Sequence, residues 1–370
     1  MNKKFFFSCF ICILIFFLSS TFYFNTQTVI KSENRSITTF PEFPKKISPR
    51  KLKLFFTQLS KFYNDNFPHR EEIILTLTKL VPSINAENFS MNKAVIGRND
   101  WIFLGNNYAR TIDKLTGKLY YHKSNNQQFD TVTRYNYYKD IADTLLSQNN
   151  KLLFLIGPNK STIYPEFLPK IIIPAPKPFH NELLQKMQEE GLHVYYPRQD
   201  ILQVKDKALL YYVTDTHWNN YGAFIAFINL MPQLNPDYRN IIKEEDFSFK
   251  PVKSHAGDLI HIGNLTFKDK DYHDTFEIFY KNVPVLQPKS IFSSRELTPP
   301  ILDYNNSNAL IDKKLLVAGD SFTAALSPYF SLTFKNWYFI HRDDLHKISP
   351  EQLKAIKADY VIYECVERNL

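Results

Sequence analysis

Short apolar runs alternate with longer segments of mixed polarity along the C-terminal two thirds of the chain. The short runs are almost continuously apolar, as in buried strands, and the longer segments repeat apolar residues every three or four positions, as in amphipathic helices. Pro232 and Pro328 are expected to end or interrupt two of the helices. This alternation predicts an α/β domain over residues 126–370, in which helices flank a parallel sheet. The predicted strands are 152–156, 193–196, 314–317, 337–340 and 360–365, and the predicted helices are 127–148, 180–190, 219–231, 322–327 and 350–358.

The N-terminal segment has a different pattern, because residues 5–24 form an uncharged apolar run of twenty residues behind Lys3 and Lys4. A helix of this length spans ~30 Å, the hydrocarbon thickness of a bilayer. A cleaved signal peptide has a shorter apolar core, of about 7–15 residues, and ends at a small-x-small site. This run ends in Phe22-Tyr23-Phe24 instead. We therefore predict an uncleaved transmembrane signal anchor, with a cleaved signal peptide as the alternative.

Two further regions depart from the alternation. Residues 25–125 precede it, and their prolines among basic residues predict an extended stalk over 25–60, followed by a membrane-proximal region with a helix near 70–80. Residues 246–298 contain two short aromatic runs with the composition of strands, at 247–252 and 275–280. We expect a β-rich insert there.

Composition and charge exclude several classes of protein. Hydrophobic residues make up 44% and charged residues 22% of the chain, as in ordinary globular proteins. The net charge is +8, but residues 1–53 hold nine basic and two acidic residues, so the remainder is nearly neutral. A nucleic-acid-binding protein would carry its positive charge on the folded domain. The three cysteines, two of them inside the apolar run, exclude a disulfide scaffold.

The first chemical motif is Gly319-Asp320-Ser321, which follows the predicted strand 314–317 and precedes a helix. Active sites of open α/β sheets lie at the carboxyl ends of the strands. The free N–H groups of a helix N-terminus can stabilise the oxyanion that forms when a serine attacks an ester. Ser321 is therefore a candidate nucleophile, and the alternative is that Asp320 or Ser321 only caps the helix.

The second motif is Asp215-Thr216-His217, directly before the predicted helix 219–231. Residues two apart in an extended segment point the same way, so the Asp215 carboxylate could orient the His217 imidazole. A nucleophilic serine needs such a base, held in one tautomer by a carboxylate. The alternative is a capping aspartate beside a surface histidine. Taken together, the two motifs supply a nucleophile, a base and an orienting group.

These residues carry a family resemblance. Asp215-Thr216-His217-Trp218-Asn219 and Gly319-Asp320-Ser321-Phe322 resemble the signature of the SGNH-hydrolase-like domain of bacterial alginate O-acetyltransferases (AlgJ and AlgX type). The likeness is to the membrane-anchored form without a carbohydrate-binding module. It implies an SGNH-hydrolase-like fold with Ser321 as nucleophile, His217 as base and Asp215 as orienting residue. Weaker matches lie at residues 33–35, 97–103, 158–169, 257–259 and 367–368.

The resemblance also implies an activity. It indicates an O-acetyltransferase that modifies an extracytoplasmic, alginate-like polysaccharide and receives acetyl groups from a membrane-bound O-acyltransferase partner. It places the protein in the bacterial inner membrane with one span and its catalytic domain in the periplasm or outside the cell. No cofactor is expected, and nucleic acid is not expected as a partner. A carbohydrate acetylesterase with the same triad and a non-catalytic scaffold in polysaccharide export remain as alternatives.

Two other groups of residues were candidates for a site. His255, Asp258 and His261 could be ligands of a metallohydrolase, but their spacing differs from a motif such as H-E-x-x-H, so we expect no metal site. Arg342 follows the predicted strand 337–340 and could bind a uronate carboxylate with two hydrogen bonds. A surface arginine without such a role is the alternative.

The anchor hypothesis predicts that the purified native protein begins near Met1 and fractionates with membranes. The uncharged run at 5–24 should remain in the bilayer, so external protease should digest residues 54–370 in spheroplasts. N-terminal sequencing and fractionation check this expectation. A soluble periplasmic protein that begins near residue 25 would contradict it.

Overall fold

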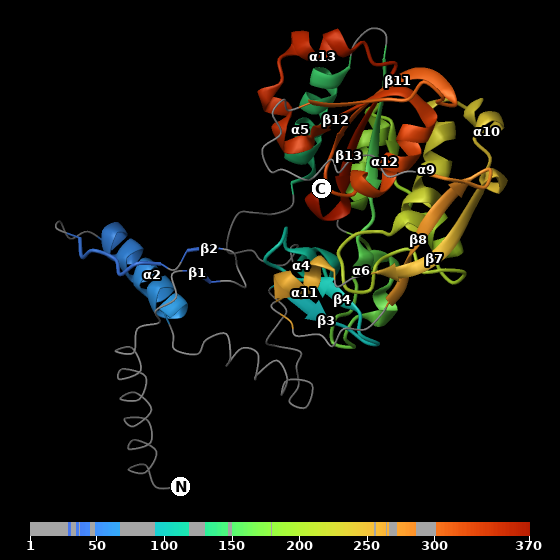
Figure 1. Ribbon diagram of the computed structural model, residues 1–370. Helices are drawn as coiled ribbons and strands as arrows, with labels where there is room; N and C mark the ends of the chain where they lie inside the picture. Colours follow the sequence, from blue (N-terminus) through green and yellow to red (C-terminus); the bar gives the residue numbers. More distant parts are fainter. Residues whose placement is uncertain are drawn as a thin grey trace, which may run out of the picture. The chain divides into compact units, whose positions relative to one another are not determined.

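The computed structural model describes residues 29–30, 35–36, 38–44, 49–66, 93–117, 130–146, 150–178, 180–254, 257–263, 265, 272–285 and 301–370 (Figure 1). The predicted anchor at 5–24 and the predicted helix near 70–80 lie outside these residues. Among the residues that are described, no helix is both long and apolar enough to cross a membrane. The chain divides into two compact units, one of residues 1–86 with 264–267 and one of residues 87–263 with 268–370.

The first unit contains an 18-residue helix, α2 (Pro49–Asn66), and a two-stranded antiparallel sheet of β1 (Val29–Ile30) and β2 (Arg35–Ser36). The expectation of an extended stalk over 25–60 therefore does not hold for residues 49–60, which are helical. Apolar residues recur along α2 at the three- and four-residue spacing of a helix, and Pro49 occupies the first helical position, where a missing N–H is tolerated. Phe40 and Phe43 contact the helix edge-on through Phe62 and Phe55.

The second unit is built on a six-stranded sheet with the strand order β10-β12-β11-β13-β5-β6. β12, β11, β13, β5 and β6 pair in parallel, whereas β10 runs antiparallel to β12. The carboxyl ends of β11, β13 and β5 therefore lie side by side at one edge. The strands are β5 (Lys151–Gly157), β6 (Val194–Tyr195), β10 (Ile301–Asn305), β11 (Ile311–Gly319), β12 (Phe334–His341) and β13 (Tyr360–Val366).

The predicted all-parallel sheet was wrong at one edge, because β10 makes the sheet mixed. Only residues 306–310 join β10 to β11. A parallel neighbour would need a crossover connection of a dozen or more residues, so a connection this short makes the chain reverse direction.

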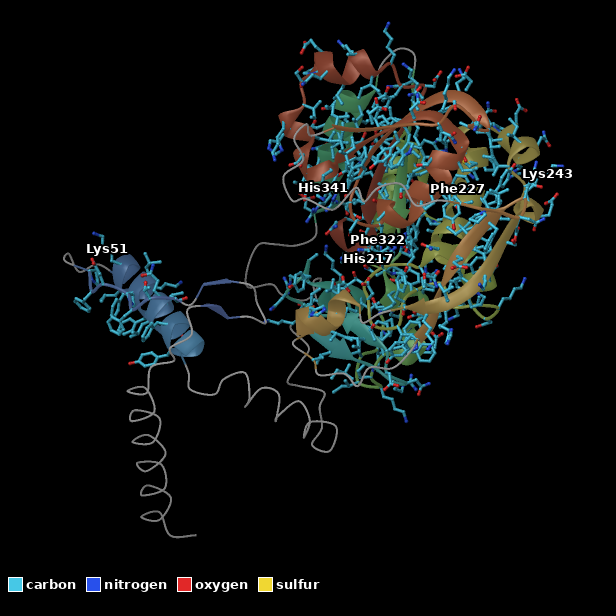
Figure 2. All side chains as sticks on the ribbon, in the orientation of Figure 1. Lys51, His217, Phe227, Lys243, Phe322 and His341 are labelled. Carbon is cyan, nitrogen blue, oxygen red and sulfur yellow. The ribbon has the colours of Figure 1, made fainter. Side chains whose placement is uncertain are left out.

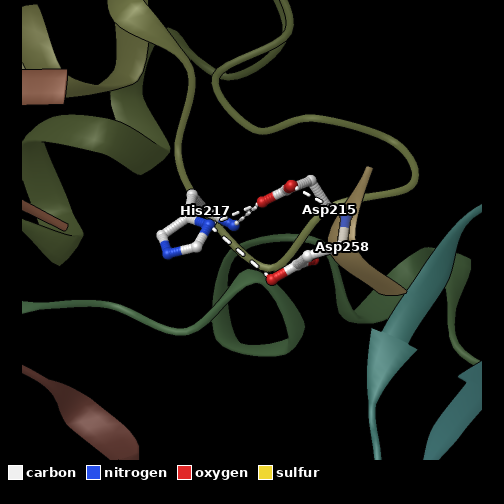
Figure 3. A group of neighbouring side chains, drawn as sticks. All are labelled: Asp215, His217 and Asp258. Carbon is white, nitrogen blue, oxygen red and sulfur yellow. Dashed lines mark hydrogen bonds and ion pairs between the residues drawn. The ribbon is translucent and has the colours of Figure 1, made fainter. Parts of the chain in front are cut away.

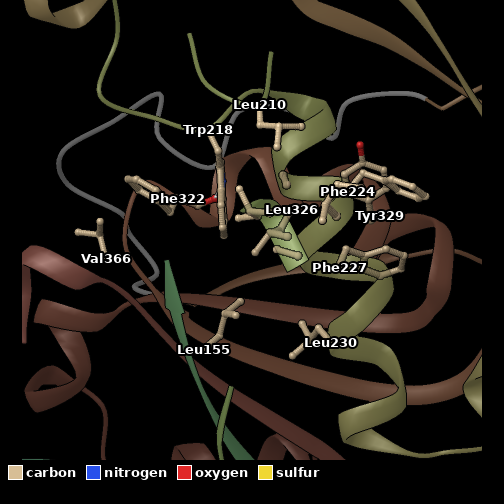
Figure 4. Packing of buried hydrophobic residues seen from close by; sticks show 14 of the residues in the cluster. Leu155, Leu210, Trp218, Phe224, Phe227, Leu230, Phe322, Leu326, Tyr329 and Val366 are labelled. Carbon is tan, nitrogen blue, oxygen red and sulfur yellow. Dashed lines mark hydrogen bonds between the residues drawn. The ribbon is translucent and has the colours of Figure 1, made fainter. Parts of the chain in front are cut away.

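Helices cover both faces of this sheet, and the alternation of side chains along β5 shows the two faces. Leu152, Phe154 and Ile156 belong to one buried cluster, together with residues of α5, α7 and α13. Leu153 and Leu155 belong to the other cluster, with residues of α8, α9 and α12 (Figure 4). The helices named here are α5 (Thr131–Leu145), α7 (Asn181–Glu189), α8 (Arg198–Val204), α9 (Asn220–Leu234), α12 (Thr323–Thr333) and α13 (Pro350–Ile356).

Two prolines that were expected to end helices lie inside them. α9 continues past Pro232 to Leu234, and α12 continues past Pro328 to Thr333. Pro328 has no N–H to donate to the carbonyl of Ala324 four residues earlier. The hydroxyl of Ser327 donates to that carbonyl instead, at 2.7 Å, so α12 is not interrupted.

The segment expected to be β-rich holds a three-stranded antiparallel sheet of β7 (Phe247–Ser254), β8 (Tyr272–Tyr280) and β9 (Val283–Pro284). α11 (Asp258–Gly263) follows β7. A hairpin of β3 (Ala94–Ile96) and β4 (Ile102–Leu104) precedes the large sheet. Shorter elements are α4 (Thr111–Leu115), α6 (Lys160–Ile163), η5 (Pro165–Phe167), α10 (Tyr238–Ile241), η6 (Glu244–Asp246), η7 (Arg342–Lys347) and η8 (Glu367–Asn369).

β13 carries Cys365, a free cysteine that is completely buried. Its Sγ lies 3.8 Å from the hydroxyl of Tyr138 in α5. Burial raises the pKa of the Cys365 thiol to about 12, although the charge of Arg342 opposes this shift. The thiol is therefore a protonated part of the core.

Candidate active site

Ser321 lies in the turn between β11 and α12, and this turn is bound tightly to β13. The Asp320 carboxylate accepts hydrogen bonds from the backbone N–H of Phe322 and of Val366, both at 3.0 Å. Glu364, buried in β13, accepts from the Asp320 N–H and the Thr323 hydroxyl, both at 2.9 Å. These four contacts fix the backbone on both sides of Ser321.

The glycine before this turn is required by a close approach. A Cβ at Gly319 would lie 2.1 Å from the Thr323 hydroxyl oxygen and 3.1 Å from a Glu364 carboxylate oxygen. Burial, and then the neighbouring Asp320 charge, raise the pKa of Glu364 well above its ordinary value. The buried Glu364 of β13 therefore supports the turn, and a glycine at position 319 leaves the room that this close contact needs.

Asp215, His217 and Ser321 form one hydrogen-bonded chain. Nε2 of His217 lies 2.7 Å from Oγ of Ser321. Nδ1 of His217 lies 2.6 Å from Oδ1 of Asp215 (Figure 3). The His217 and Asp215 side chains keep 26% and 21% of their surface exposed, so small molecules in solution can reach the group. The structure thus brings together the three residues predicted from separate motifs. This geometry suits transfer of the Ser321 proton to His217 during attack on an acyl carbon.

Asp215 does not cap the helix that follows. The cap of α9 is Asn219, whose side chain accepts from the N–H of Gly222 at 2.9 Å. Burial opposes ionisation of Asp215, but the hydrogen bond and charge of His217 hold the pKa of its carboxyl well below the ordinary value. Asp215 is therefore an ionised partner of the imidazole.

Trp218 and Phe322, which directly follow the two motifs, contact each other. Trp218 donates from Nε1 to the carbonyl of Phe322 at 3.0 Å, and their rings lie 5.0 Å apart. The Phe322 ring also lies 5.2 Å from the His217 ring, and the two residues are neighbours in Figure 2. Trp218 and Phe322 join the segment that carries the base to the turn that carries the nucleophile.

A second carboxylate, that of Asp258 in α11, holds the segment between Asp215 and His217. It accepts from the N–H of Thr216 at 2.8 Å and from the Thr216 hydroxyl at 2.7 Å, and its own N–H donates to Asp215 at 3.0 Å. Burial, followed by the Asp215 charge, raises its pKa. Sequence reasoning had not assigned Asp258 to this site, although the match at 257–259 was an available signal.

Asp215, His217 and Asp258 are the only group within the described ranges whose ligand atoms lie within 4.8 Å of one another, as in a metal site (Figure 3). Their atoms already have hydrogen-bond partners: Nδ1 of His217 with Asp215, and both Asp258 oxygens with Thr216. The contacts therefore serve to orient His217. Of the histidines considered as ligands, His261 lies in α11 and His255 lies outside the described residues.

Arg342 begins η7, directly after β12, and only 14% of its side chain is exposed. Its Nε lies 3.8 Å from Asp320 and 3.6 Å from Asp343. Burial opposes its charge, but Asp320 and the other neighbouring groups raise the pKa of Arg342 above its ordinary value. Arg342 is therefore partly buried beside Asp320, and a substrate contact by Arg342 stays a prediction.

Gly257 allows α11 to approach the Asp215 segment. A Cβ there would lie 2.5 Å from both the Asp215 Cβ and the Thr214 carbonyl oxygen. The variant Gly257→Ala should therefore lose about 1–3 kcal/mol of stability from overpacking and at least tenfold in turnover of a small acetyl ester, since Asp215 must move. Thermal melts and ester hydrolysis check this.

Gly191→Ala is the matched control, because Gly191 has a positive φ of 86° but open space around its Cβ position. It should also lower the melting temperature, through backbone strain, without changing turnover per folded molecule. If Gly257→Ala turned over the ester at the wild-type rate, this account of α11 would be wrong.

Comparisons with known proteins indicate the family to which this chain belongs. The sequence profile described as "SGNH hydrolase-like domain, acetyltransferase AlgX" matches residues 94–296, which include Asp215 and His217 and end before Ser321. The "Probable alginate O-acetylase AlgJ" of Azotobacter vinelandii is 26% identical over 220 residues, which are 56% of this chain and 50% of that protein. The chain thus spans about half the length of the curated relative it matches.

Solved structures resemble the fold. PatB1 of Bacillus cereus, in its structure with a sulfonyl adduct, is 16% identical with a TM-score of 0.51, over 75% of this chain and 96% of that chain. The O-acetyltransferase domain of Pseudomonas putida AlgJ is 18% identical with a TM-score of 0.45, over 74% of this chain and 91% of that chain. The resemblance and the SGNH-hydrolase-like α/β fold inferred from the motifs are confirmed. The profile matches more than half of the residues of this chain. The chain therefore belongs to the family of SGNH hydrolase-like domains of the acetyltransferase AlgX.

Proposed function

We propose that this protein is an O-acetyltransferase that modifies a polysaccharide outside the cytoplasm through an acetyl-Ser321 intermediate. The observation that carries this proposal is the hydrogen-bonded chain from Asp215 through His217 to Ser321, with contacts of 2.6 and 2.7 Å. Membership of an acetyltransferase family supports it. The name of the Azotobacter relative favours an alginate-like acceptor.

In the first half-reaction, Oγ of Ser321 attacks the carbonyl carbon of a donor acetyl ester while Nε2 of His217 takes the hydroxyl proton. The ionised Asp215 stabilises the imidazolium that forms. The backbone N–H of Ser321, in the turn that precedes α12, is the oxyanion donor that we assign. The tetrahedral intermediate then expels the donor alcohol, which takes the proton from His217 and leaves acetyl-Ser321.

In the second half-reaction, a sugar hydroxyl of the acceptor attacks the acetyl carbon. His217 accepts the hydroxyl proton and returns it to Oγ of Ser321 as the acetyl–serine bond breaks. The product is an O-acetylated sugar and free enzyme, without a cofactor. If water attacks in place of the sugar, the same groups release acetate, which is the reaction of an esterase.

The proposal also includes the cellular location of the reaction and the source of the acetyl group. The apolar run at 5–24 would anchor the protein in the bacterial inner membrane, with the catalytic domain in the periplasm or outside the cell. A membrane-bound O-acyltransferase partner would supply the acetyl group. Arg342 faces Asp320, so binding a uronate carboxylate would require its guanidinium to reach outward from that ion pair.

The variant Ser321→Ala tests the nucleophile. It should abolish turnover of p-nitrophenyl acetate and formation of an acetylated Ser321 peptide, because no other group takes the place of Oγ. The melting temperature should change by less than about 2 °C, since the lost hydroxyl contributes little to packing. Ester assays, peptide mass spectrometry and thermal melts measure the three quantities. Equal activity in the variant and the wild type would favour the scaffold alternative.

Acceptor oligosaccharides distinguish the transferase from the esterase. With an acetyl donor and an oligouronide, the wild type should give acetylated sugar in excess of free acetate. Release of acetate alone, under conditions in which acetyl-Ser321 forms, would favour the esterase.

The variant Asp215→Asn tests the orienting carboxylate. Its amide would favour the wrong imidazole tautomer, so turnover should fall at least ~10²-fold; the same change costs about 10⁴-fold in serine proteases. Because the folded pKa of Asp215 lies below its ordinary value, its ionised form contributes stability above about pH 4 that is lost as pH falls, and the variant should lack this loss. Turnover and melting temperature as functions of pH measure both effects.

Asp312→Asn is the control, because the Asp312 side chain is 80% exposed and lies near the start of β11, away from Ser321. It should keep the wild-type rate. Near-wild-type turnover in Asp215→Asn would mean that Asp215 does not orient His217.

A further inference from the structure

Lys160 is a buried lysine at the start of α6, three residues after the end of β5. Its side chain is almost completely buried and extends to the backbone of the segment that carries Asp215. Nζ donates to the backbone carbonyls of Tyr212 and Val213 at 3.1 Å and of Asp215 at 2.6 Å. An ammonium has three N–H groups and no acceptor, so three carbonyls match it completely.

Two aromatic rings and three carboxylates surround the Lys160 amine. Nζ lies 5.6 Å from the Trp101 ring centroid and 5.3 Å from that of Phe103, and Lys160 is only 4% exposed. The charged groups that face it are the carboxylates of Asp215, Asp258 and Asp274. Burial lowers the pKa of Lys160 to about 7, although these three carboxylates oppose the shift.

The protonation state of Lys160 determines how many of these three backbone carbonyls receive a hydrogen bond. The neutral form has two N–H groups and a lone pair, so one of the three carbonyls loses its donor and faces a lone pair instead. The shortest contact is to the carbonyl of Asp215, the residue whose carboxylate orients His217. Loss of a donor in this set therefore affects the segment that aligns the imidazole with Ser321.

We propose that Lys160 is a positioning residue whose ammonium holds residues 212–215 so that Asp215 and His217 align with Ser321, and that loss of its proton releases this segment and lowers turnover. This inference rests on the proposed function. It predicts a pH profile with a falling alkaline limb, on which Lys160 loses its proton.

Lys160→Met keeps an unbranched side chain that is one atom shorter and removes the charged amine. We expect kcat for p-nitrophenyl acetate to fall by about 10²-fold, as a displacement of about 1 Å can cause, with KM changed less than about threefold. The falling alkaline limb should be absent, whereas a role in folding alone would lower the melting temperature and leave the shape of the profile unchanged. Lys160→Arg keeps a cation at every pH, so it should restore part of the rate and move the alkaline limb up by at least about 1 pH unit.

Lys205→Met is the matched control. Lys205 also donates to a carbonyl, that of Ile163 at 3.1 Å, and to Glu166 at 2.9 Å, and its Nζ lies 5.6 Å from the Tyr164 ring centroid. Its contacts lie outside the Asp215 segment, so this variant should keep the falling alkaline limb of the wild-type profile.

A second measurement separates this proposal from the proposed function. The downfield proton resonance of the His217 Nδ1–H reports the hydrogen bond to Asp215 without any substrate, and it should be present in the wild type and lost or broadened in Lys160→Met. A wild type that shows the resonance but no ester turnover contradicts the proposed function, and the resonance in Lys160→Met still decides the role of Lys160. An unchanged resonance or an unchanged alkaline limb in folded Lys160→Met overturns the proposal. If that variant does not fold, an unchanged alkaline limb in Lys160→Arg overturns it.

Discussion

The position of β13 between β11 and β5 is the constraint on which the candidate site depends. All seven of its residues are buried, and it pairs in parallel with both neighbours. Glu364 and Val366 hold the turn that carries Ser321. Glu367, directly after the strand, accepts from the N–H of Asn159 at 2.9 Å and from the Thr162 hydroxyl at 2.8 Å, which fixes the segment around Lys160. β13 and the residue after it therefore anchor both the turn of Ser321 and the segment around Lys160.

The order of the triad along the chain follows from how its parts are supported. Asp215 and His217 come from a loop between α8 and α9, not from a strand of the large sheet. This loop is held by Asp258 of α11 on one side and by the Trp218–Phe322 contact on the other. Since each support comes from a different part of the chain, the base can precede the nucleophile in sequence and still meet it in space.

The sequence predicted those features that depend on neighbours along the chain. β5, β11 and β13 were found because they are apolar runs of strand length, and Ser321, His217 and Asp215 because each motif lies beside a helix. β10 was missed because it is a five-residue edge strand with no buried residue, and it lacks the continuous apolar run by which the other strands were recognised. Lys160 and Asp258 were missed as members of the site because their partners lie 55 and 42 residues away in sequence. The interruption expected at Pro328 rested on its missing N–H, whereas the hydrogen bond from the Ser327 hydroxyl to the Ala324 carbonyl carries no signal in the sequence.

The burial of β13 also has a consequence for redox chemistry. Disulfide exchange and oxidation require a thiolate that can be reached by the oxidant. The Cys365 thiol is completely buried against Tyr138, and its pKa of about 12 keeps it protonated. In an oxidising compartment this cysteine stays reduced for as long as β13 remains in the sheet. The strand that anchors the turn of Ser321 thereby also protects the domain from forming a wrong disulfide at Cys365.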